Sequence, residues 1–276
     1  MVTEKQRAQA QAFSAMHREQ KLFVLPNAWD VGSAVIFEQA GFQAIATTSA
    51  GVAHSFGLPD GEQIAKEDIL YLAKKITDRI DTPLSVDFER GFGMTPEEVK
   101  HSVSQLLSAG AVGFNLEDGL PDSSLTPVGQ QVEKIKAICE LKRELELDFV
   151  VNARTCTYLN NVASEEEMLE IATARGNAYL EAGADCIFVP GYLNEATISA
   201  LANRILGPLN ILLTNTTYDF PRLEALGVRR VSIGSALARK LYGEAVNFAQ
   251  KLKAGDTKEM LNTQFTLSKS NEYFLR

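Results

Sequence analysis

The chain has 276 residues, of which 45% are apolar and 22% charged, and its 27 Lys and Arg against 35 Asp and Glu leave a formal net charge of −8. This balance argues against a nucleic-acid-binding protein, which needs a basic face to meet phosphates. No segment approaches the ~18 apolar residues of a membrane-spanning helix, and the N-terminal residues show no apolar core of a secretion signal. The three cysteines have no metal-ligand spacing and are typical of reduced thiols, so we expect a cytoplasmic protein without membrane or nucleic-acid partners.

Four glycines mark a pattern that recurs along the chain. Gly41, Gly110, Gly183 and Gly227 each end an amphipathic segment and precede a short apolar run. Glycine ends a helix readily because it adopts the left-handed conformation without a steric penalty from a Cβ atom. The apolar runs have the length of strands that are buried on both faces. Each copy therefore predicts a helix followed by a strand.

Four further strands are predicted where short apolar runs are bounded by Pro, Asn or charged residues: Leu22–Leu25, Leu84–Asp87, Phe149–Asn152 and Asn210–Thr214. In chain order, helices are predicted over Asp30–Gln39, Glu62–Arg79, Pro96–Ser108, Val128–Glu146, Ser164–Ala182, Glu195–Ile205, Tyr218–Ala225 and Ala236–Lys253. Capping boxes beginning at Thr95 and Ser164 support two of these helix starts.

Strict alternation of eight strands with helices predicts an α/β fold, a closed (β/α)8 TIM-type barrel. A doubly wound sheet fits less well, because no Gly-rich phosphate loop follows the first strand. We expect a single domain over residues 1–276, with an extra N-terminal helix at about 4–19 and a C-terminal helical tail at about 236–276. Contacts between subunits are the simplest use of these two additions.

Candidate site residues lie where the predicted strands end, because the reacting groups of a barrel enzyme collect at that end. In chain order they are Trp29; Thr48, Ser49, Ala50 and Gly51; Asp60; Asp87 and Glu89; Glu117; Arg154; and Asn215.

The three acids Asp87, Glu89 and Glu117 suggest a site for a hard cation such as Mg²⁺, which prefers oxygen ligands. No His or Cys pattern nearby favours zinc. The alternative is that these acids cap loops or pair with Arg90 and Arg154. We favour the cation, because a buried cluster of unpaired carboxylates is costly.

Arg154 either pairs with the acids or makes a two-pronged contact with an anionic substrate. The backbone N–H groups of Thr48–Gly51, a small-residue turn, could hold a carboxylate, although a tight loop without a ligand is an equal alternative. Trp29 either walls the pocket or is an ordinary core aromatic. His17 and His101 are expected at the surface, away from the site.

Five motifs, in order, resemble the isocitrate lyase / phosphoenolpyruvate mutase superfamily over roughly residues 20–250. They are the Thr-Ser-Ala-Gly segment at 48–51 with Gly-Leu-Pro-Asp at 57–60, Asp-Phe-Glu-Arg-Gly-Phe-Gly at 87–93, Gly-Phe-Asn-Leu-Glu-Asp at 113–118, Asn-Ala-Arg-Thr at 152–155, and Tyr-Leu-Glu-Ala-Gly-Ala-Asp at 179–185.

The resemblance implies Mg²⁺ or Mn²⁺ near Asp87, Glu89 and Glu117, with Asp60 in the outer shell. It implies small anionic 2-oxo or 2-hydroxy acid substrates, held by the Thr48–Gly51 backbone and by Arg154. It also implies a barrel whose last helix is exchanged with a neighbouring subunit, in a dimer of dimers.

Two departures from the superfamily bear on the reaction. The lyase branch has a Lys-Lys/Arg-Cys-Gly-His loop that supplies a general acid, whereas residues 119–127 here contain no Cys, Lys or His. The mutase branch has an Asn in this loop and a His after the sixth strand, and neither is present.

The combined expectation is a Mg²⁺-dependent, lyase-type enzyme that cleaves a C–C bond of a 2-oxo or 2-hydroxy acid, decarboxylation included, through a metal-stabilised enolate. Arg154, Asp60 and Glu117 are the candidate catalytic residues. The alternatives are P–C bond chemistry, as phosphonomutase or phosphonopyruvate hydrolase, and a barrel that binds a 2-oxo acid without catalysis.

Overall fold

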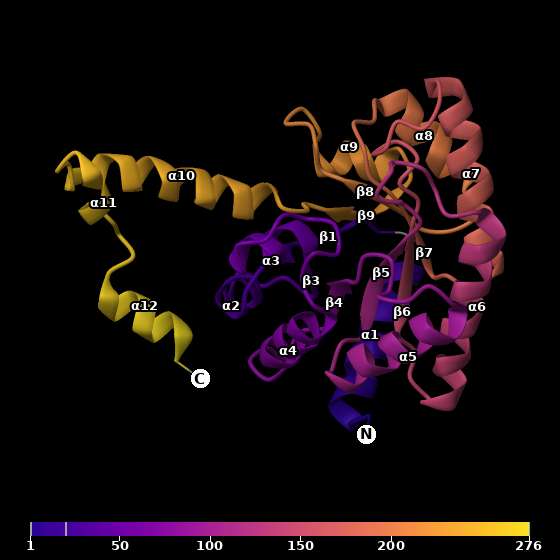
Figure 1. Ribbon diagram of the computed structural model, residues 1–276, viewed down its shortest axis with the longest axis horizontal. Helices are drawn as coiled ribbons and strands as arrows, with labels where there is room; N and C mark the ends of the chain where they lie inside the picture. The colour runs from indigo at the N-terminus through magenta and orange to yellow at the C-terminus, as the bar shows by residue number, and fades with distance from the viewer. Residues whose placement is uncertain (1, 20, 276) are drawn as a thin grey trace.

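Residues 2–19 and 21–275 are described by a computed structural model of the chain; positions 1 and 276, the predicted limits of the domain, lie outside them. Nine parallel strand segments form one sheet in the order β1-β9-β8-β7-β6-β5-β4-β3-β2 (Figure 1). Because β1 and β2 are consecutive in the chain and stand at the two ends of this order, the sheet closes into a barrel with the helices outside. The predicted fold class is confirmed.

The strands are β1 (Phe23–Leu25), β2 (Asn27–Ala28), β3 (Ile45–Thr47), β4 (Leu84–Asp87), β5 (Gly113–Glu117), β6 (Val150–Arg154), β7 (Cys186–Val189), β8 (Leu209–Leu212) and β9 (Val228–Ser232). The helices are α1 (Glu4–Arg18), α2 (Val31–Gln39), α3 (Ser49–Ser55), α4 (Lys66–Thr77), α5 (Pro96–Ser108), α6 (Val128–Glu144), α7 (Glu165–Glu181), α8 (Glu195–Arg204), α9 (Phe220–Ala225), α10 (Ala236–Lys253), α11 (Lys258–Leu261) and α12 (Leu267–Phe274).

Pro26 divides the predicted first strand into β1, which pairs with β9, and β2, which pairs with β3. Proline cannot donate a ladder hydrogen bond, so it interrupts a strand. The Asn27 side chain holds this junction, since it donates to Thr47 O (2.8 Å) and accepts from the N–H groups of Ile233 and Gly234 (2.8 and 3.0 Å). The barrel seam is therefore closed at the carboxyl end of the strands.

Two helix predictions differ from the structure in the segment that follows β3. The Thr48–Gly51 segment, predicted as a tight turn, begins helix α3, and the Thr48 hydroxyl caps its first turn. The helix predicted from Glu62 begins at Lys66, because Glu62 has a φ of 58° and cannot continue a right-handed helix. The capping boxes at Thr95 and Ser164 are confirmed.

Helix α1 lies across the amino-terminal end of the barrel. Its Gln6 side chain donates to Leu107 O and Ala111 O, which precede β5. Phe13 is fully buried, and a Cβ atom on Gly113 would lie 2.7 Å from the Phe13 ring. The surface position expected for His17 is wrong: this residue is 4% exposed, because it lies on the same buried face of α1, and burial followed by the charge of Arg230 lowers its pKa to about 3.

The inside of the barrel is partly polar, which the apolar appearance of the strands did not predict. Arg230 on β9 donates to Asn115 on β5 (3.4 Å), and these strands are far apart in the sheet order, so the contact crosses the interior. Buried polar side chains here are Ser85, Asn115, Asn152, Asn210, Arg230 and Ser232.

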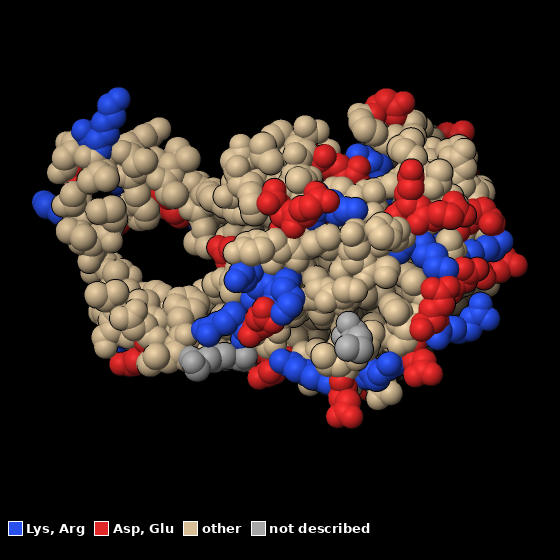
Figure 2. All heavy atoms as spheres, turned by 60° about the horizontal axis from the view of Figure 1, so that its bottom comes forward, with Lys and Arg blue, Asp and Glu red and all other residues tan. Residues whose placement is uncertain are grey.

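Helix α10 leaves the barrel and, with α11, forms an arm whose last helix, α12, returns toward α2 (Figure 1). Of the eighteen residues of α10, only Ala238 is buried. Figure 2 shows open space between this arm and the barrel, and mixed acidic and basic side chains over the barrel face in view. Among the described residues, no helix is long and apolar enough to cross a membrane.

Removal of the Phe13 ring, which packs against the amino-terminal end of the barrel, should destabilise the protein. We expect Phe13→Ala to lower the free energy of unfolding by about 3–5 kcal/mol, because a fully buried ring is replaced by a cavity. Chemical denaturation of Gln11→Ala, an exposed change on the same helix, should stay within about 0.5 kcal/mol of the unaltered protein. Equal effects of the two changes would contradict the packing of α1 described above.

Candidate active site

Three acids lie together at the carboxyl ends of adjacent strands. Asp87 is the last residue of β4, Glu117 is the last residue of β5, and Glu89 follows β4 by two residues. The two strands are parallel neighbours with Asp87 opposite Asn115, so their ends meet at one edge. Asp87 is 9% and Glu89 3% exposed, and the Glu117 side chain is 12% exposed. The structure therefore brings together the three residues predicted to hold a cation.

Glu89 has a φ of 46°, in the left-handed region that non-glycine residues rarely adopt. The conformation is held by hydrogen bonds on both sides: the Glu117 N–H donates to Glu89 O (2.8 Å) and the Gly91 N–H to Phe88 O (2.8 Å). The Glu89 carboxylate also accepts the N–H of Glu62. Backbone strain of this kind concentrates at functional sites, where surrounding contacts maintain it.

The surroundings of Glu89 and Glu117 disfavour the negatively charged form of these side chains. Burial, and then the neighbouring carboxylates, raise the pKa of Glu89 to about 8. Those carboxylates are Asp87, Glu117, Asp60 and Glu62. Burial also raises the pKa of Glu117 to about 7, although Arg154 opposes this shift. The acids thus repel one another in a site that lacks enough positive charge to balance them.

Arg154, the last residue of β6, forms an ion pair with Glu117 (Nη1 to Oε2, 2.7 Å). Of the two alternatives left open for this residue, the structure contains the pairing with an acid. The Arg154 guanidinium also lies 5.8 Å from the centre of the Phe188 ring, and its buried Nε has no hydrogen-bond partner among the described residues. Arg90, the other arginine considered, pairs with Glu62 and not with the three strand-end acids.

The backbone of residues 48–51 has fewer free donors than a turn would offer. The Thr48 N–H donates to Ala28 O (3.0 Å), the Ser49 N–H to Asp87 Oδ2 (3.1 Å), and the Gly51 N–H to the Thr48 hydroxyl (3.5 Å). Only the Ala50 N–H has no acceptor among the described residues. At Gly51 a Cβ atom would lie 2.6 Å from Thr48 Cγ2 and 2.9 Å from Trp29 Cβ, so glycine is required there.

The remaining predicted residues lie in different places. Trp29 is half-buried directly beside Gly51. Asp60 is exposed on the loop between α3 and α4, close enough to contribute to the raised pKa values of Glu89 and Glu117. Asn215 is exposed in the loop after β8, accepts a hydrogen bond from the Thr217 N–H (3.0 Å) and lines, with Tyr158 and Tyr192, a cavity whose lining includes none of the three acids.

No three His, Cys, Asp or Glu side chains within residues 2–19 and 21–275 stand already arranged as metal ligands. Two of the acids already have other partners: Glu117 forms an ion pair with Arg154, and Glu89 accepts a hydrogen bond from the Glu62 N–H. The chemistry of the donor set nevertheless fits a hard divalent cation, because it consists of carboxylate oxygens whose mutual repulsion a cation would relieve.

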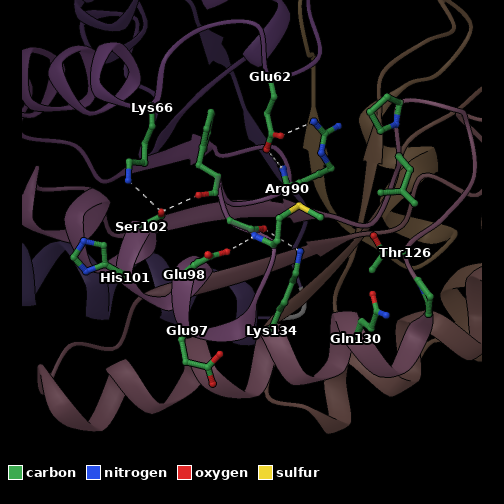
Figure 3. A pocket seen from close by; sticks show the side chains of 16 residues that line it. Glu62, Lys66, Arg90, Glu97, Glu98, His101, Ser102, Thr126, Gln130 and Lys134 are labelled. Carbon is green, nitrogen blue, oxygen red and sulfur yellow. Dashed lines mark hydrogen bonds and ion pairs between the residues drawn. The ribbon is translucent and has the colours of Figure 1, made fainter.

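A cavity of about 1020 Å³ has none of these three acids in its lining. Figure 3 shows the Glu62–Arg90 pair above it, with Lys66 and Ser102 on one side and Lys134 below. None of the predicted site residues lines it. Both members of the Glu62–Arg90 pair line this cavity, and the Glu62 N–H donates to Glu89, so the pair connects the cavity wall to the acids.

Asp118, next to Glu117, is fully buried and organises the loops around the site. It accepts hydrogen bonds from the Tyr179 hydroxyl (2.7 Å), from Arg175 (3.0 Å) and from the Cys156 N–H (2.8 Å). Arg175 also donates to Thr126 O (2.9 Å), at the end of the loop that differs from the superfamily pattern. From the sequence, Asp118 was recognised only as part of a motif, because its side-chain partners Arg175 and Tyr179 lie on α7, far away in the chain.

The loop itself folds back as a small hairpin, with Gly119 bridged to Leu125. Cys156 lies beneath it, with its Sγ 3.9 Å from Glu117 Oε2. Burial raises the pKa of Cys156 to about 12, so this thiol stays protonated. All three cysteines are free thiols.

The raised pKa values of Glu89 and Glu117 predict that, in the absence of divalent cations, the stability of the protein depends on pH. Between about pH 4.5 and 8 the folded protein retains protons on Glu89 and Glu117 that the unfolded chain has lost, so the free energy of unfolding should fall as pH rises. Each acid can contribute at most about 1.4 kcal/mol per pH unit.

Denaturation curves across this range test the prediction. Glu89→Gln should flatten the decline, whereas Glu181→Gln, an exposed change at the end of α7, should leave it in place. A stability that is constant or rises over this interval would show that burial and the neighbouring carboxylates do not raise the pKa values of Glu89 and Glu117.

Comparison with known proteins agrees with this geometry. Residues 13–253 match the family described as phosphoenolpyruvate phosphomutase. The 2-methylisocitrate lyase of Escherichia coli is 30% identical over 207 residues, covering 72% of this chain and 67% of that protein. A solved Burkholderia cenocepacia structure, assigned only to the broad class of lyases and mutases, has a TM-score of 0.90 and 33% identity, and covers 99% of this chain and 98% of that one.

A phosphonopyruvate hydrolase solved with oxalate and Mg²⁺ has a TM-score of 0.85 and 26% identity, covering 96% of this chain and 94% of that one. The chain therefore belongs to the phosphoenolpyruvate phosphomutase family and, in agreement with its motifs, is an enzyme of the isocitrate lyase / phosphoenolpyruvate mutase superfamily.

Proposed function

We propose that the protein is a Mg²⁺- or Mn²⁺-dependent lyase that cleaves a C–C bond of a small 2-oxo or 2-hydroxy acid, a decarboxylation being one form. The observation that carries this proposal is the buried cluster of Asp87, Glu89 and Glu117, with Arg154 directly against it. In such a site the carboxylates could bind a cation, and Arg154, whose Nη1 lies 2.7 Å from Glu117 Oε2, could bind an anion next to it. A small acid chelating a divalent metal matches that combination of charges.

Asp87, Glu89 and Glu117 would hold the cation, with Asp60 in its outer shell. When bound, a divalent cation supplies positive charge against the negative charge that develops on a 2-oxo acid as its bond breaks. Mg²⁺ typically takes one or two carboxylates and keeps several waters, so the three acids need not all contact it. The phosphonopyruvate hydrolase relative, solved with Mg²⁺ and oxalate, supports this assignment.

Arg154 would change partners when substrate binds. In the structure its guanidinium neutralises Glu117 at 2.7 Å. A cation taken up by Glu117 and a substrate carboxylate taken up by Arg154 would replace one ion pair by two, which keeps every buried charge balanced. The guanidinium suits this exchange because its planar donors match a carboxylate in a two-pronged contact.

The Ala50 N–H is the donor of the 48–51 segment left to hold a substrate carboxylate, with Trp29 beside it as a wall of the pocket. Thr48, Ser49 and Gly51 would then shape this end of the site, because their own N–H groups already have acceptors. Asn215, in the loop after β8, would line the mouth on another side through its exposed amide.

The composition of the 119–127 loop favours a leaving group that needs no proton. This loop contains no Cys, Lys or His, and the nearest thiol, Cys156, is buried with its pKa raised to about 12. Carbon dioxide departs without protonation, so its loss is compatible with this loop. The three free thiols also suit a reducing compartment, and we place the reaction in the cytoplasm.

A second candidate is P–C bond chemistry on phosphonopyruvate or a related phosphonate. The specific observation in its favour is the likeness to phosphonopyruvate hydrolase, which extends over 96% of this chain. Arg154 could hold a phosphonate as well as a carboxylate, because both are anionic oxygen groups.

A direct assay separates the two candidates. Oxaloacetate, several 2-hydroxy diacids and phosphonopyruvate are incubated with protein and Mg²⁺, pyruvate is measured, and phosphorus NMR follows any P–C cleavage. We expect pyruvate from a carbon substrate and none when the metal is chelated. Turnover of phosphonopyruvate alone would favour the second candidate, and inactivity on all substrates would overturn both.

Two variants test the assigned residues in the same assay. Asp87→Ala should abolish Mg²⁺ binding measured by calorimetry while leaving the fold intact, and unchanged affinity would remove Asp87 from the site. Arg154→Lys should lower kcat/KM by about 100-fold or more, because lysine cannot make the two-pronged contact. Lys142→Arg, a basic change at a structural pair with Asp185, should leave kcat/KM within a factor of about two.

We also propose that the arm formed by α10–α12 packs on a second copy of this chain, in a dimer of dimers that exchanges the last helix. The arm exposes large apolar side chains, and monomers seldom expose so continuous an apolar surface. These side chains are Leu237, Leu241, Tyr242, Val246, Leu252, Met260, Leu261, Phe265, Leu267, Phe274 and Leu275.

Light scattering after gel filtration tests this assembly. The unaltered protein should be at least dimeric, and Leu241→Asp with Val246→Asp should shift it toward the monomer, because two charges are placed on the apolar face. Asn247→Asp with Gln250→Asp, which adds the same charge at exposed polar positions of α10, should leave the mass unchanged. A monomeric unaltered protein would contradict the proposal.

A further inference from the structure

The carboxylate of Asp87 is held by one donor on each oxygen. The Ser49 N–H donates to Oδ2 and the side-chain amide of Asn115 donates to Oδ1, both at 3.1 Å. The first donor belongs to the backbone and is fixed by the fold. The second belongs to a side-chain amide, which would present its oxygen to Asp87 and repel it if the amide were rotated by half a turn.

Two donors below Asn115 fix the orientation of this amide. Asn152 donates to Asn115 Oδ1 at 2.7 Å, and the Arg230 guanidinium approaches the same oxygen at 3.4 Å. A guanidinium has donors and no acceptor, so an Asn115 amide turned over would place NH₂ against Arg230 and oxygen against Asp87. Both contacts favour the orientation that points the amide NH₂ at Asp87.

The supporting layer is sealed from water. Asn115 is 3% exposed, and Asn152 and Arg230 are both 0% exposed. No described carboxylate forms an ion pair with Arg230, whose other neighbours are the His17 ring nitrogen at 3.5 Å and the Phe13 ring at 5.9 Å. In such a low-dielectric interior, hydrogen bonds from Arg230 and Asn152 are stronger than the same bonds at a surface.

We propose that Asn115 is a positioning residue for the cation site, which it serves by holding the Asp87 carboxylate in the direction of the mouth, with Asn152 and Arg230 fixing its amide from below. The inference rests on the proposed function, because it assumes that Asp87 binds the metal. Outer-shell partners that orient a ligand commonly change metal affinity by about 10–100-fold when they are removed.

Three buried asparagines of the barrel interior make a matched test. Asn115→Leu removes the donor to Asp87, and Asn152→Leu removes a donor to Asn115. Asn210→Leu removes an amide whose side-chain partner, among the residues that the structure describes, is Ser232 alone. All three positions are 0–3% exposed, so the cost to folding should be similar. Mn²⁺ affinity is measured from the electron paramagnetic resonance signal of the free ion, with circular dichroism confirming the fold.

We expect Asn115→Leu to weaken Mn²⁺ binding by about 10–100-fold and Asn152→Leu by about 3–10-fold, since Arg230 still orients the amide in the second variant. Asn210→Leu should stay within a factor of about two. If Asn115→Leu does not fold, the comparison of Asn152→Leu with Asn210→Leu decides the matter.

Two negative results are distinguishable. Unaltered protein that binds no Mn²⁺ would overturn both the proposed function and this inference. Unaltered protein that binds Mn²⁺, together with Asn115→Leu or Asn152→Leu variants that bind it as Asn210→Leu does, would overturn the positioning role alone.

Discussion

Mutual repulsion among carboxylates at the carboxyl ends of β4 and β5 is the constraint on which the rest of the site depends. Asp87, Glu89 and Glu117 are nearly buried, and the raised pKa values of the two glutamates record how poorly this environment tolerates their charge. Folding alone supplies one partial remedy, the ion pair between Glu117 and Arg154. The proposed cation site follows from this shortage of positive charge, and the proposed anion contact of Arg154 follows from its position against Glu117.

The layer below the acids explains how they are kept in place. Helix α1 closes the amino-terminal end of the barrel, so water does not reach the interior from that side. This seal allows a polar layer of Asn115, Asn152 and Arg230 to persist where apolar side chains usually fill a barrel, and it is this layer that reaches Asp87. The stability of the barrel floor and the geometry of the candidate site are therefore linked through the same buried side chains.

The 119–127 loop directly follows Glu117 and Asp118 in the chain. Asp118 ties the 119–127 loop to α7 through Arg175 and Tyr179, which gives the loop a fixed base despite its altered composition. Asp118 also joins this loop to the site, because its N–H donates to Arg154 O (3.1 Å) and its carbonyl accepts from the Thr126 N–H (2.7 Å). Family members with lyase and phosphonopyruvate hydrolase activities share the fold, so the specific substrate depends on groups around the free side of the ligand.

Periodicity and strand ends were enough to predict from the sequence the barrel, most helix positions and the gathering of the three acids, because alternating elements force parallel strands whose carboxyl ends meet. Asn115 could have been found too, since it lies two residues before Glu117 and thus on the same face of β5. The ion pair of Arg154, the contact of Arg230 with Asn115 and the burial of His17 could not be predicted. They depend on distances between segments far apart in the chain, which are determined only when the barrel closes and α1 packs across its amino-terminal end.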